Sequence, residues 1–297
     1  IPALLMAVMF YWGFRDYLNK IVAPADAMNV YVTASQWNWE FAYPDGGSTL
    51  EQELIGAMKS PVIAFPIDKP TKLIMTSKDV IHSFYIPAFR TKRDIFPNRY
   101  TTLWFQPTGR ITHTFSADDK ALVPVDPKRP GYYLFCAEYC GDQHSQMAAR
   151  VAVLSQPDYE AWRKQQLNTD EIPLPELGRI LYTAKGCSAC HSVDGSRNTG
   201  PTWKGIWGST ADAAGWKSKG DEKDGVVGYE YVRESILDPG AYLVPGFTNQ
   251  MSSYQGRVTE REILALTTYI KSLTEAYADE AVQDGVRELQ ERGVTQE

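Results

Sequence analysis

Residues 31–43 read "YVTASQWNWEFAY", and this run indicates a β-sheet fold for the first part of the chain. Trp37, Trp39 and Phe41 alternate with polar residues, which is the period of two expected when one face of a strand is buried. Further strand-like runs, separated by turn-forming residues, are "SPVIAFPI" (60–67), "TKLIMTS" (71–77), "RYTTLWFQP" (99–107), "GYYLFCAEY" (131–139) and "ARVAVLS" (149–155). Short strands separated by turn-forming residues predict an all-β sandwich or barrel over residues 28–155.

The character of the sequence changes to helical in its last third. The segment "PELGRILYTAKGC" (175–187) predicts one helix and "TEREILALTTYIKSL" (259–273) predicts another. In the second, Thr259 and Glu262 have the spacing of a capping box, and apolar residues recur at helical intervals. We therefore predict a small all-α domain over residues 174–274, joined to the β domain by a linker over residues 156–173.

Composition and charge narrow the range of partners. The chain has 297 residues, 43% hydrophobic and 22% charged, which is an ordinary globular composition with room for about two domains. Residues 275–297 hold seven acidic residues against two arginines, so most of the net charge of -6 belongs to this tail. We predict that the tail is a solvated terminus, either helical or frayed. The remainder is nearly neutral, which makes nucleic acid a poor partner because phosphate binding needs clustered Lys and Arg.

The first fourteen residues, "IPALLMAVMFYWGF", are uncharged and mostly apolar, and Arg15 and Asp16 follow at once. A full membrane span needs about twenty apolar residues. A signal peptide with "APA" (23–25) as its cleavage site is the alternative, but the intervening charges are misplaced for it. We favour residues 1–22 as the end portion of a transmembrane helix whose aromatic end lies at the membrane interface.

Residues 136–147, "CAEYCGDQHSQM", collect soft donor atoms in one short segment. Cys136, Cys140, His144 and Met147 bring two thiols, an imidazole and a thioether. A disulfide, a zinc site and a blue-copper site all remain open on these residues, although methionine adds little to zinc and blue copper uses one cysteine. Two cysteines able to bridge would also hold two copper ions if a second histidine came from elsewhere.

This segment, together with "HSFYIPAFRTKRDIFPNRY" (82–100), resembles subunit II of haem-copper cytochrome c oxidases. The resemblance covers residues 1 to about 165 and implies a cupredoxin-like Greek-key β-barrel that carries the dinuclear copper centre CuA. The ligands that it implies are bridging Cys136 and Cys140, His82 and His144 on one copper each, Met147 as a weak ligand, and the Glu138 backbone carbonyl.

The same resemblance implies two further roles and shows one departure. It implies that the Glu138 side chain reaches a magnesium ion shared with subunit I, and that electrons enter at Trp37, although an aromatic stripe is more often core. The departure is a long segment over residues 110–130, "RITHTFSADDKALVPVDPKRP", which contains His113. We predict that this insertion is a surface loop and that His113 is exposed to solvent.

A second motif, "KGCSACHS" (185–192), places Cys187, Cys190 and His191 in the Cys-x-x-Cys-His pattern that attaches c-type haem. A thioredoxin-like dithiol would need a βαβ setting, and a zinc knuckle would need another cysteine pair; residues 174–274 offer neither. An electron carrier also needs a distal ligand, which is commonly methionine. Met251, in "GFTNQMSSYQG" (246–256), is the candidate.

Residues 175–273 resemble a class I cytochrome c domain, and "NTGPTWKGIWG" (198–208) matches the segment that flanks its haem. This resemblance implies an all-α fold, one covalently bound haem c and a hydrogen bond between Pro201 and His191.

The two modules together resemble a subunit II with a fused cytochrome c, as in caa-type oxidases. This implies a protein of the bacterial cytoplasmic membrane with its soluble domains on the periplasmic side. Electrons would pass from a soluble cytochrome c or a membrane quinol-oxidising complex through haem c and CuA to oxidase subunit I, where oxygen is reduced. The implied catalytic residues all lie in other oxidase subunits. A CuA-containing nitric oxide reductase, a membrane-anchored electron shuttle and a copper-delivery protein are the rival hypotheses.

Overall fold

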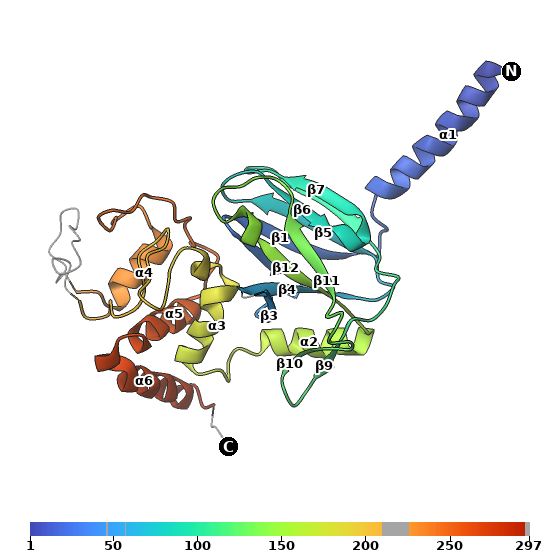
Figure 1. The fold of residues 1–297 in the computed structure, drawn as a ribbon. Helices are drawn as coiled ribbons and strands as arrows, with labels where there is room; N and C mark the ends of the chain where they lie inside the picture. Colours follow the sequence, from blue (N-terminus) through green and yellow to red (C-terminus); the bar gives the residue numbers. More distant parts are fainter. Residues whose placement is uncertain (46, 57, 210–225, 295–297) are drawn as a thin grey trace. The chain divides into compact units, whose positions relative to one another are not determined.

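A computed structural model describes residues 1–45, 47–56, 58–209 and 226–294, and Figure 1 shows its elements in chain order. The chain divides into two compact units, Ile1–Leu167 and Asn168–Glu297.

The first unit is a β-sandwich. One sheet has the strand order β2 (Asn38–Ala42), β1 (Met28–Ser35), β5 (Thr71–Ser77), β8 (Thr101–Phe105). The other has the order β3 (Gln52–Ile55), β4 (Met58–Pro66), β12 (Ala148–Leu154), β11 (Tyr132–Cys136), β6 (His82–Ile86), β7 (Thr91–Ile95). Most neighbours are antiparallel, but β1 pairs with β5 and β4 with β12 in parallel. Buried side chains from both sheets form one core, which confirms the all-β prediction.

The alternating run at residues 31–43 does not form one strand, because it turns between β1 and β2 at Gln36 and Trp37. Trp39 and Phe41 are fully buried in the core, whereas Trp37 at the turn is only partly buried. The periodicity therefore identifies the buried face correctly but gives no sign of the turn.

The segment 110–130 is not a simple surface loop, and the predicted exposure of His113 is wrong. The strands β9 (His113–Ser116) and β10 (Ala121–Pro124) form a hairpin, and the His113 side chain is completely buried. Its Nε2 lies 2.9 Å from Oε1 of Glu53, and its Nδ1 lies 2.9 Å from the Thr112 hydroxyl. These polar partners allow an imidazole to be buried.

Most of the predicted linker is a helix that belongs to the first unit. Helix α2 (Gln156–Leu167) contributes Tyr159 and Trp162 to the core of the sandwich. The side-chain carbonyl of Gln166 accepts hydrogen bonds from the backbone N–H groups of Leu50 and Glu51. The prediction of a linker over residues 156–173 is thus wrong for its first twelve residues.

The N-terminal segment is helical, as the expectation for residues 1–22 requires. Helix α1 (Pro2–Ile21) buries none of its residues. Within the described parts of the chain, no helix combines the length and the apolarity that crossing a bilayer requires.

The second unit is helical, with α3 (Leu174–Ala184), α4 (Tyr229–Leu237), α5 (Glu260–Ser272) and α6 (Ala278–Glu291). The capping box of Thr259 and Glu262 is present at the start of α5, as predicted. Helices α3 and α5 approach closely at Gly178, where an added Cβ would lie 2.6 Å from the Tyr269 Cβ and from the Ala265 carbonyl carbon, and closer still to the Ala265 carbonyl oxygen. A glycine is therefore needed at this crossing.

The acidic tail over residues 275–297 forms the helix α6, one of the two predicted forms, but one face of this helix is buried and not solvated. Ala281 and Leu289 of this helix are buried, and its acidic residues pair with basic residues of α5. The Lys271 ammonium lies 2.6 Å from Asp284, and Nε of Arg261 lies 2.8 Å from Glu288. The charge count conceals an apolar stripe on the same helix, and the stripe decides how the helix packs.

Candidate functional site

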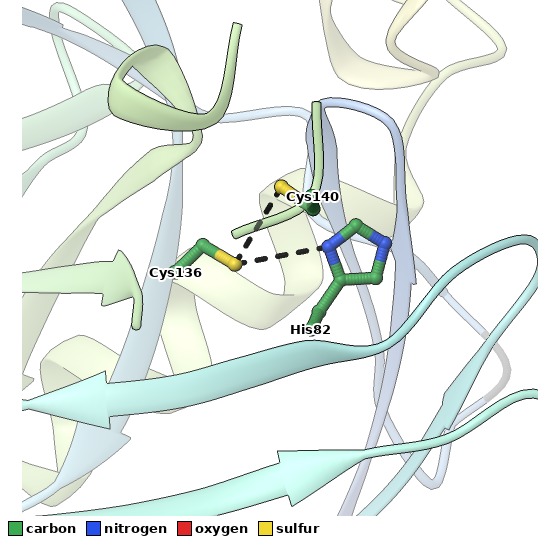
Figure 2. A group of neighbouring side chains, drawn as sticks. All are labelled: His82, Cys136 and Cys140. Carbon is green, nitrogen blue, oxygen red and sulfur yellow. Dashed lines mark hydrogen bonds between the residues drawn. The ribbon is translucent and has the colours of Figure 1, made fainter. Parts of the chain in front are cut away.

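Strand pairing brings His82 beside Cys136. The strands β6 and β11 are antiparallel, with Cys136 opposite Phe84. His82 lies two residues before Phe84 and therefore on the same face of the sheet. As a result, Nδ1 of His82 is 3.7 Å from Sγ of Cys136 (Figure 2).

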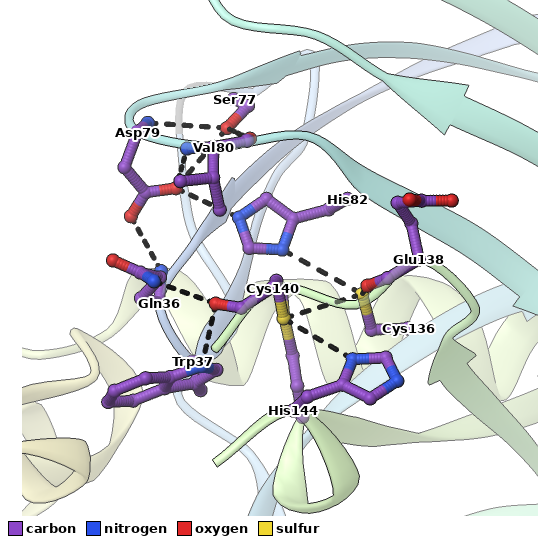
Figure 3. A network of polar contacts seen from close by, with 11 residues as sticks. Gln36, Trp37, Ser77, Asp79, Val80, His82, Cys136, Glu138, Cys140 and His144 are labelled. Carbon is purple, nitrogen blue, oxygen red and sulfur yellow. Dashed lines mark hydrogen bonds and ion pairs between the residues drawn. The ribbon is translucent and has the colours of Figure 1, made fainter. Parts of the chain in front are cut away.

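The segment after β11 folds back on itself and gathers the remaining donor atoms. The Cys136 N–H donates to the Met147 carbonyl at 3.1 Å, which closes the loop. Within it, Sγ of Cys140 lies 3.8 Å from Sγ of Cys136, 3.4 Å from Nδ1 of His144 and 3.9 Å from Sδ of Met147. Each imidazole thus faces a different thiol, and the two thiols lie between the imidazoles (Figure 3).

Both cysteines are free thiols in a buried setting. Their sulfur atoms are 3.8 Å apart, far beyond the ~2.05 Å of a disulfide bond. His82, Cys136, Cys140 and Met147 are all buried. In the described residues, His82, Cys136 and Cys140 are the one group of histidine, cysteine or acidic residues whose ligand atoms lie close enough together to hold a metal ion.

The two thiols influence each other's ionisation. The hydrogen bond between the sulfurs lowers the pKa of Cys136 and raises the pKa of Cys140, so the pair loses its first proton readily and its second with difficulty. The carbonyl oxygen of Glu138 lies 3.2 Å from Sγ of Cys136, while the Glu138 side chain is exposed.

Asp79 orients His82, a role that the sequence reasoning missed. Its Oδ1 lies 2.8 Å from Nε2 of His82, which leaves Nδ1 turned toward Cys136. Burial alone would lower the pKa of His82, but its hydrogen bonds to Asp79 and Cys136 outweigh burial and raise it. The available signal was an acidic residue three positions before a candidate histidine ligand.

Gln36 and Trp37 form the β1–β2 turn and contact the loop of residues 136–147, which carries the donor atoms. The Gln36 side-chain amide and the Trp37 indole N–H both donate to the Cys140 carbonyl, at 2.7 and 3.1 Å (Figure 3). The Gln36 backbone N–H donates to Asp79 at 2.7 Å. The β1–β2 turn therefore contacts both Cys140 in the loop and Asp79, the residue that orients His82. Sequence reasoning singled out Trp37 but not Gln36.

A second cluster occurs in the helical unit, where Cys187, Cys190 and His191 form a single tight turn. The short helix η3 (Cys187–Ala189) follows α3, and the His191 N–H donates to the Cys187 carbonyl at 2.9 Å. Both cysteines are partly exposed. Two accessible thiols and an imidazole are thus presented within one turn.

Pro201 and Gly200 fix the His191 ring. Nδ1 of His191 lies 2.7 Å from the Pro201 carbonyl and donates to it, so Nε2 keeps its lone pair. Burial lowers the pKa of His191 and favours this neutral form. The Trp203 ring packs 5.3 Å from the imidazole, measured between ring centroids. An added Cβ at Gly200 would lie 2.9 Å from Cε1 of His191, so sequence reasoning also missed a required glycine.

Gly200→Ala is expected to displace the His191 ring, because the new methyl group and the imidazole cannot occupy their present positions together. Haem attachment through the two cysteines should persist, since the clash reaches the Cys190 backbone carbonyl but neither thiol. The reduction potential of the haem should change, and redox titration of the full chain would measure it. Gly205→Ala is unsuitable as a control because its φ is +71°; Ser196→Ala, an exposed change nearby, is the appropriate one. An unchanged potential would contradict the role of Gly200.

Met251 lies partly buried in the irregular segment between α4 and α5. Its position across a haem from His191 stays a prediction.

Two family models match the chain. The periplasmic domain of cytochrome c oxidase subunit II matches residues 28–114, and cytochrome c matches residues 175–274. Relatives that bear the name of subunit 2 extend across both regions. The chain thus carries a region of the subunit II periplasmic-domain family followed by a cytochrome c domain.

Similarity to individual members of the subunit II family is moderate. Alternative cytochrome c oxidase subunit 2 of Bradyrhizobium diazoefficiens is 32% identical over 54% of this chain and 59% of its own length. Cytochrome c oxidase subunit 2 of Bacillus subtilis is 29% identical over 84% of this chain and 63% of its own. This chain thus spans about three fifths of these relatives. The solved periplasmic domain of subunit II from Bradyrhizobium japonicum is 23% identical, with a TM-score of 0.40, and covers 49% of this chain and 97% of that one.

Proposed function

We propose that this chain is the electron-transfer subunit of a haem-copper terminal oxidase. An external donor supplies electrons to haem c, from which they pass to a dinuclear copper centre and then to subunit I for the reduction of oxygen to water. The observation that carries the proposal is the joint presence of a buried sulfur–imidazole cluster and a Cys-x-x-Cys-His turn in one chain.

The donor atoms around the two thiols fit a pair of copper ions better than one metal. Cys136 and Cys140 are placed to bridge, because each sulfur has the other sulfur and a different imidazole nitrogen within 3.8 Å. A site for a single zinc or copper ion would not need two thiols that each face a different imidazole. His82 and His144 would each hold one copper, with Met147 as a weak ligand and the Glu138 backbone carbonyl as a further donor.

The copper pair, when bound, supplies one-electron exchange without making or breaking covalent bonds. The protein contributes rigidity. His82 is held by Asp79, the Cys140 carbonyl by Gln36 and Trp37, and the Met147 carbonyl by the Cys136 N–H at 3.1 Å. Ligands fixed in this way move little when the charge of a bound metal changes, and small rearrangement favours fast electron transfer.

The turn at residues 187–191 fits a covalent haem c. Cys187 and Cys190 are partly exposed, as thioether formation with the haem vinyl groups requires. His191 offers Nε2 as the proximal ligand because Pro201 accepts the hydrogen bond from its Nδ1. We assign Met251 as the distal ligand. The haem, when bound, supplies the second one-electron carrier.

The proposal also includes a shared magnesium site, a point of electron entry, a membrane setting and an electron donor. We propose that the Glu138 side chain, which is exposed, contributes to a magnesium site shared with subunit I. Trp37, in contact with the Cys140 carbonyl, is proposed as the residue where electrons reach the copper pair. The expected setting is a bacterial cytoplasmic membrane with both soluble domains on its periplasmic side, anchored through a segment that includes residues 1–22. The donor is a soluble cytochrome c or a membrane quinol-oxidising complex.

Isolation of the native complex tests the proposed partnership. We expect the chain to require detergent for extraction and to co-purify with a large polytopic haem protein that consumes oxygen when reduced cytochrome c is supplied. A complex that reduces nitric oxide but not oxygen would overturn the assignment to an oxidase. A chain that is extracted without detergent and without partners would indicate a free shuttle.

Met251→Ala is expected to leave the haem attached and to lower its reduction potential, because thioether ligation raises the potential of c-type haem. A decrease on the order of 0.1 V is expected, within the ~0.8 V range that axial ligands control. Redox titration of the full chain measures it, and Ser252→Ala is the neighbouring control. An unchanged potential in Met251→Ala would remove this residue from the ligand set.

A further inference from the structure

The segment that carries Met251 is fastened to the end of α4. The Tyr254 N–H donates to the Ile236 carbonyl at 3.1 Å, and the Ser253 hydroxyl donates to the Leu237 carbonyl at 2.5 Å. Tyr254 is the third residue after Met251, and an extended chain of three residues reaches only about 10 Å. Whatever holds Tyr254 therefore restricts where Met251 can go.

The Tyr254 side chain joins this segment to the haem-attachment turn. Its hydroxyl donates to the Lys185 carbonyl at 2.6 Å. Lys185 is the C-cap of α3 and lies two residues before Cys187. The hydrogen bond thus connects the segment of the proposed distal ligand with the segment of the proposed proximal ligand.

The Lys185 side chain makes a second connection between the same segments. It is buried, and its ammonium donates to the Arg257 carbonyl at 3.2 Å and lies 3.2 Å from Glu262 in the capping box of α5. A buried lysine is stable only when its charge is paired, and here the pairing ties residue 257 to the end of α3. The Arg257 guanidinium packs over the Tyr254 ring at 4.2 Å, which adds to the same contact.

We propose that Tyr254 and Lys185 form a latch that positions Met251 at the haem iron. Both are positioning residues, and the inference rests on the proposed haem function. The latch holds residues 253–257 against α4 and the attachment turn, so withdrawal of Met251 from the iron requires that these contacts open. Its strength sets the fraction of molecules in which the distal position is accessible to another ligand.

Imidazole is a suitable probe because it binds ferric haem only where the methionine has been displaced. Its apparent dissociation constant therefore falls in proportion as the accessible fraction rises. We expect Tyr254→Phe to lower this constant about three- to tenfold, which corresponds to the loss of one hydrogen bond. Haem attachment should be unchanged. The measurement is an imidazole titration of the full-length ferric protein, followed by the weak red absorption band of sulfur-ligated haem.

Two variants complete the design. Tyr229→Phe is the matched control, because it removes a tyrosine hydroxyl of the same unit that contacts exposed Glu260, and we expect an unchanged imidazole affinity. Lys185→Met keeps the Lys185 carbonyl but removes the ammonium, and we expect a shift in the same direction as for Tyr254→Phe. If Tyr254→Phe does not fold, the Lys185→Met result decides.

The outcomes separate this inference from the haem assignment. If the sulfur band is present in the parent protein and absent in Met251→Ala, but Tyr254→Phe and Lys185→Met both bind imidazole like the parent, the latch is refuted and the haem ligands stand. If the parent lacks covalent haem or the sulfur band, the proposed function itself fails.

Discussion

Cys140→Ser is expected to abolish the paired copper centre while leaving haem c attached. Sγ of Cys140 lies within 3.9 Å of donor atoms of Cys136, His144 and Met147 and is therefore central to the cluster. A serine hydroxyl is a hard donor that does not bridge two copper ions as a thiolate does. The haem turn belongs to the other unit and should be unaffected.

The measurement is the ratio of copper to covalent haem, together with the visible spectrum of the copper pair. We expect the parent ratio of about two to fall to one or less, with complete loss of the paired spectrum. Ser145→Ala, an exposed change in the same loop, is the control and should keep both. His144→Ala should also lose the paired absorption and keep the haem. If Cys140→Ser retained the paired spectrum, Cys140 would not be a bridging ligand.

Gly178→Ala is expected to destabilise the cytochrome unit strongly. The added methyl group would meet the Ala265 carbonyl carbon and the Tyr269 Cβ at 2.6 Å, and neither a backbone atom nor a Cβ can turn aside as a flexible side-chain end can. Relief would require α3 and α5 to separate. Overpacking of this kind costs roughly 1–3 kcal/mol, which exceeds the gain of about 1 kcal/mol in helix propensity from glycine to alanine.

Thermal unfolding of the haem-loaded full chain, followed by haem absorbance, measures the effect of Gly178→Ala. We expect a lower midpoint for the cytochrome transition and no change in the transition of the β unit. Arg179→Ala is the control in the same helix, because Arg179 is partly exposed and its ion pair with Glu176 contributes little. A midpoint equal to or above that of the parent would show that the crossing tolerates a side chain.

The elements that could be predicted from the sequence are those whose signal is local. The run "TKLIMTS" is β5 (Thr71–Ser77), and the capping box starts α5, because each pattern lies within one element. His113 was misjudged because its partner Glu53 is sixty residues away on another strand. The packing of α6 was not predicted, because the net charge of the helix hides an apolar stripe. The role of this stripe becomes clear only where α3 and α5 cover it.

The residues of the candidate site also divide into those with a local signal in the sequence and those without one. Cys136, Cys140 and the Cys-x-x-Cys-His turn are visible in short spacings, and the resemblance to subunit II adds His82. The residues that hold them in place are not visible, since Gln36 reaches the Cys140 carbonyl from 104 positions away. Gly200 and Gly178 matter because of what lies against them, and a sequence does not state which atoms those are.

The central claim is that the two thiols hold two copper ions in electronic contact. Electron-spin resonance of the oxidised full chain, combined with metal analysis, tests it most directly. We expect about two copper ions per covalent haem and a hyperfine pattern from one unpaired electron shared by both copper nuclei. A signal localised on a single copper, a stoichiometry of one zinc ion, or a metal-free protein with Cys136 disulfide-bonded to Cys140 would contradict it.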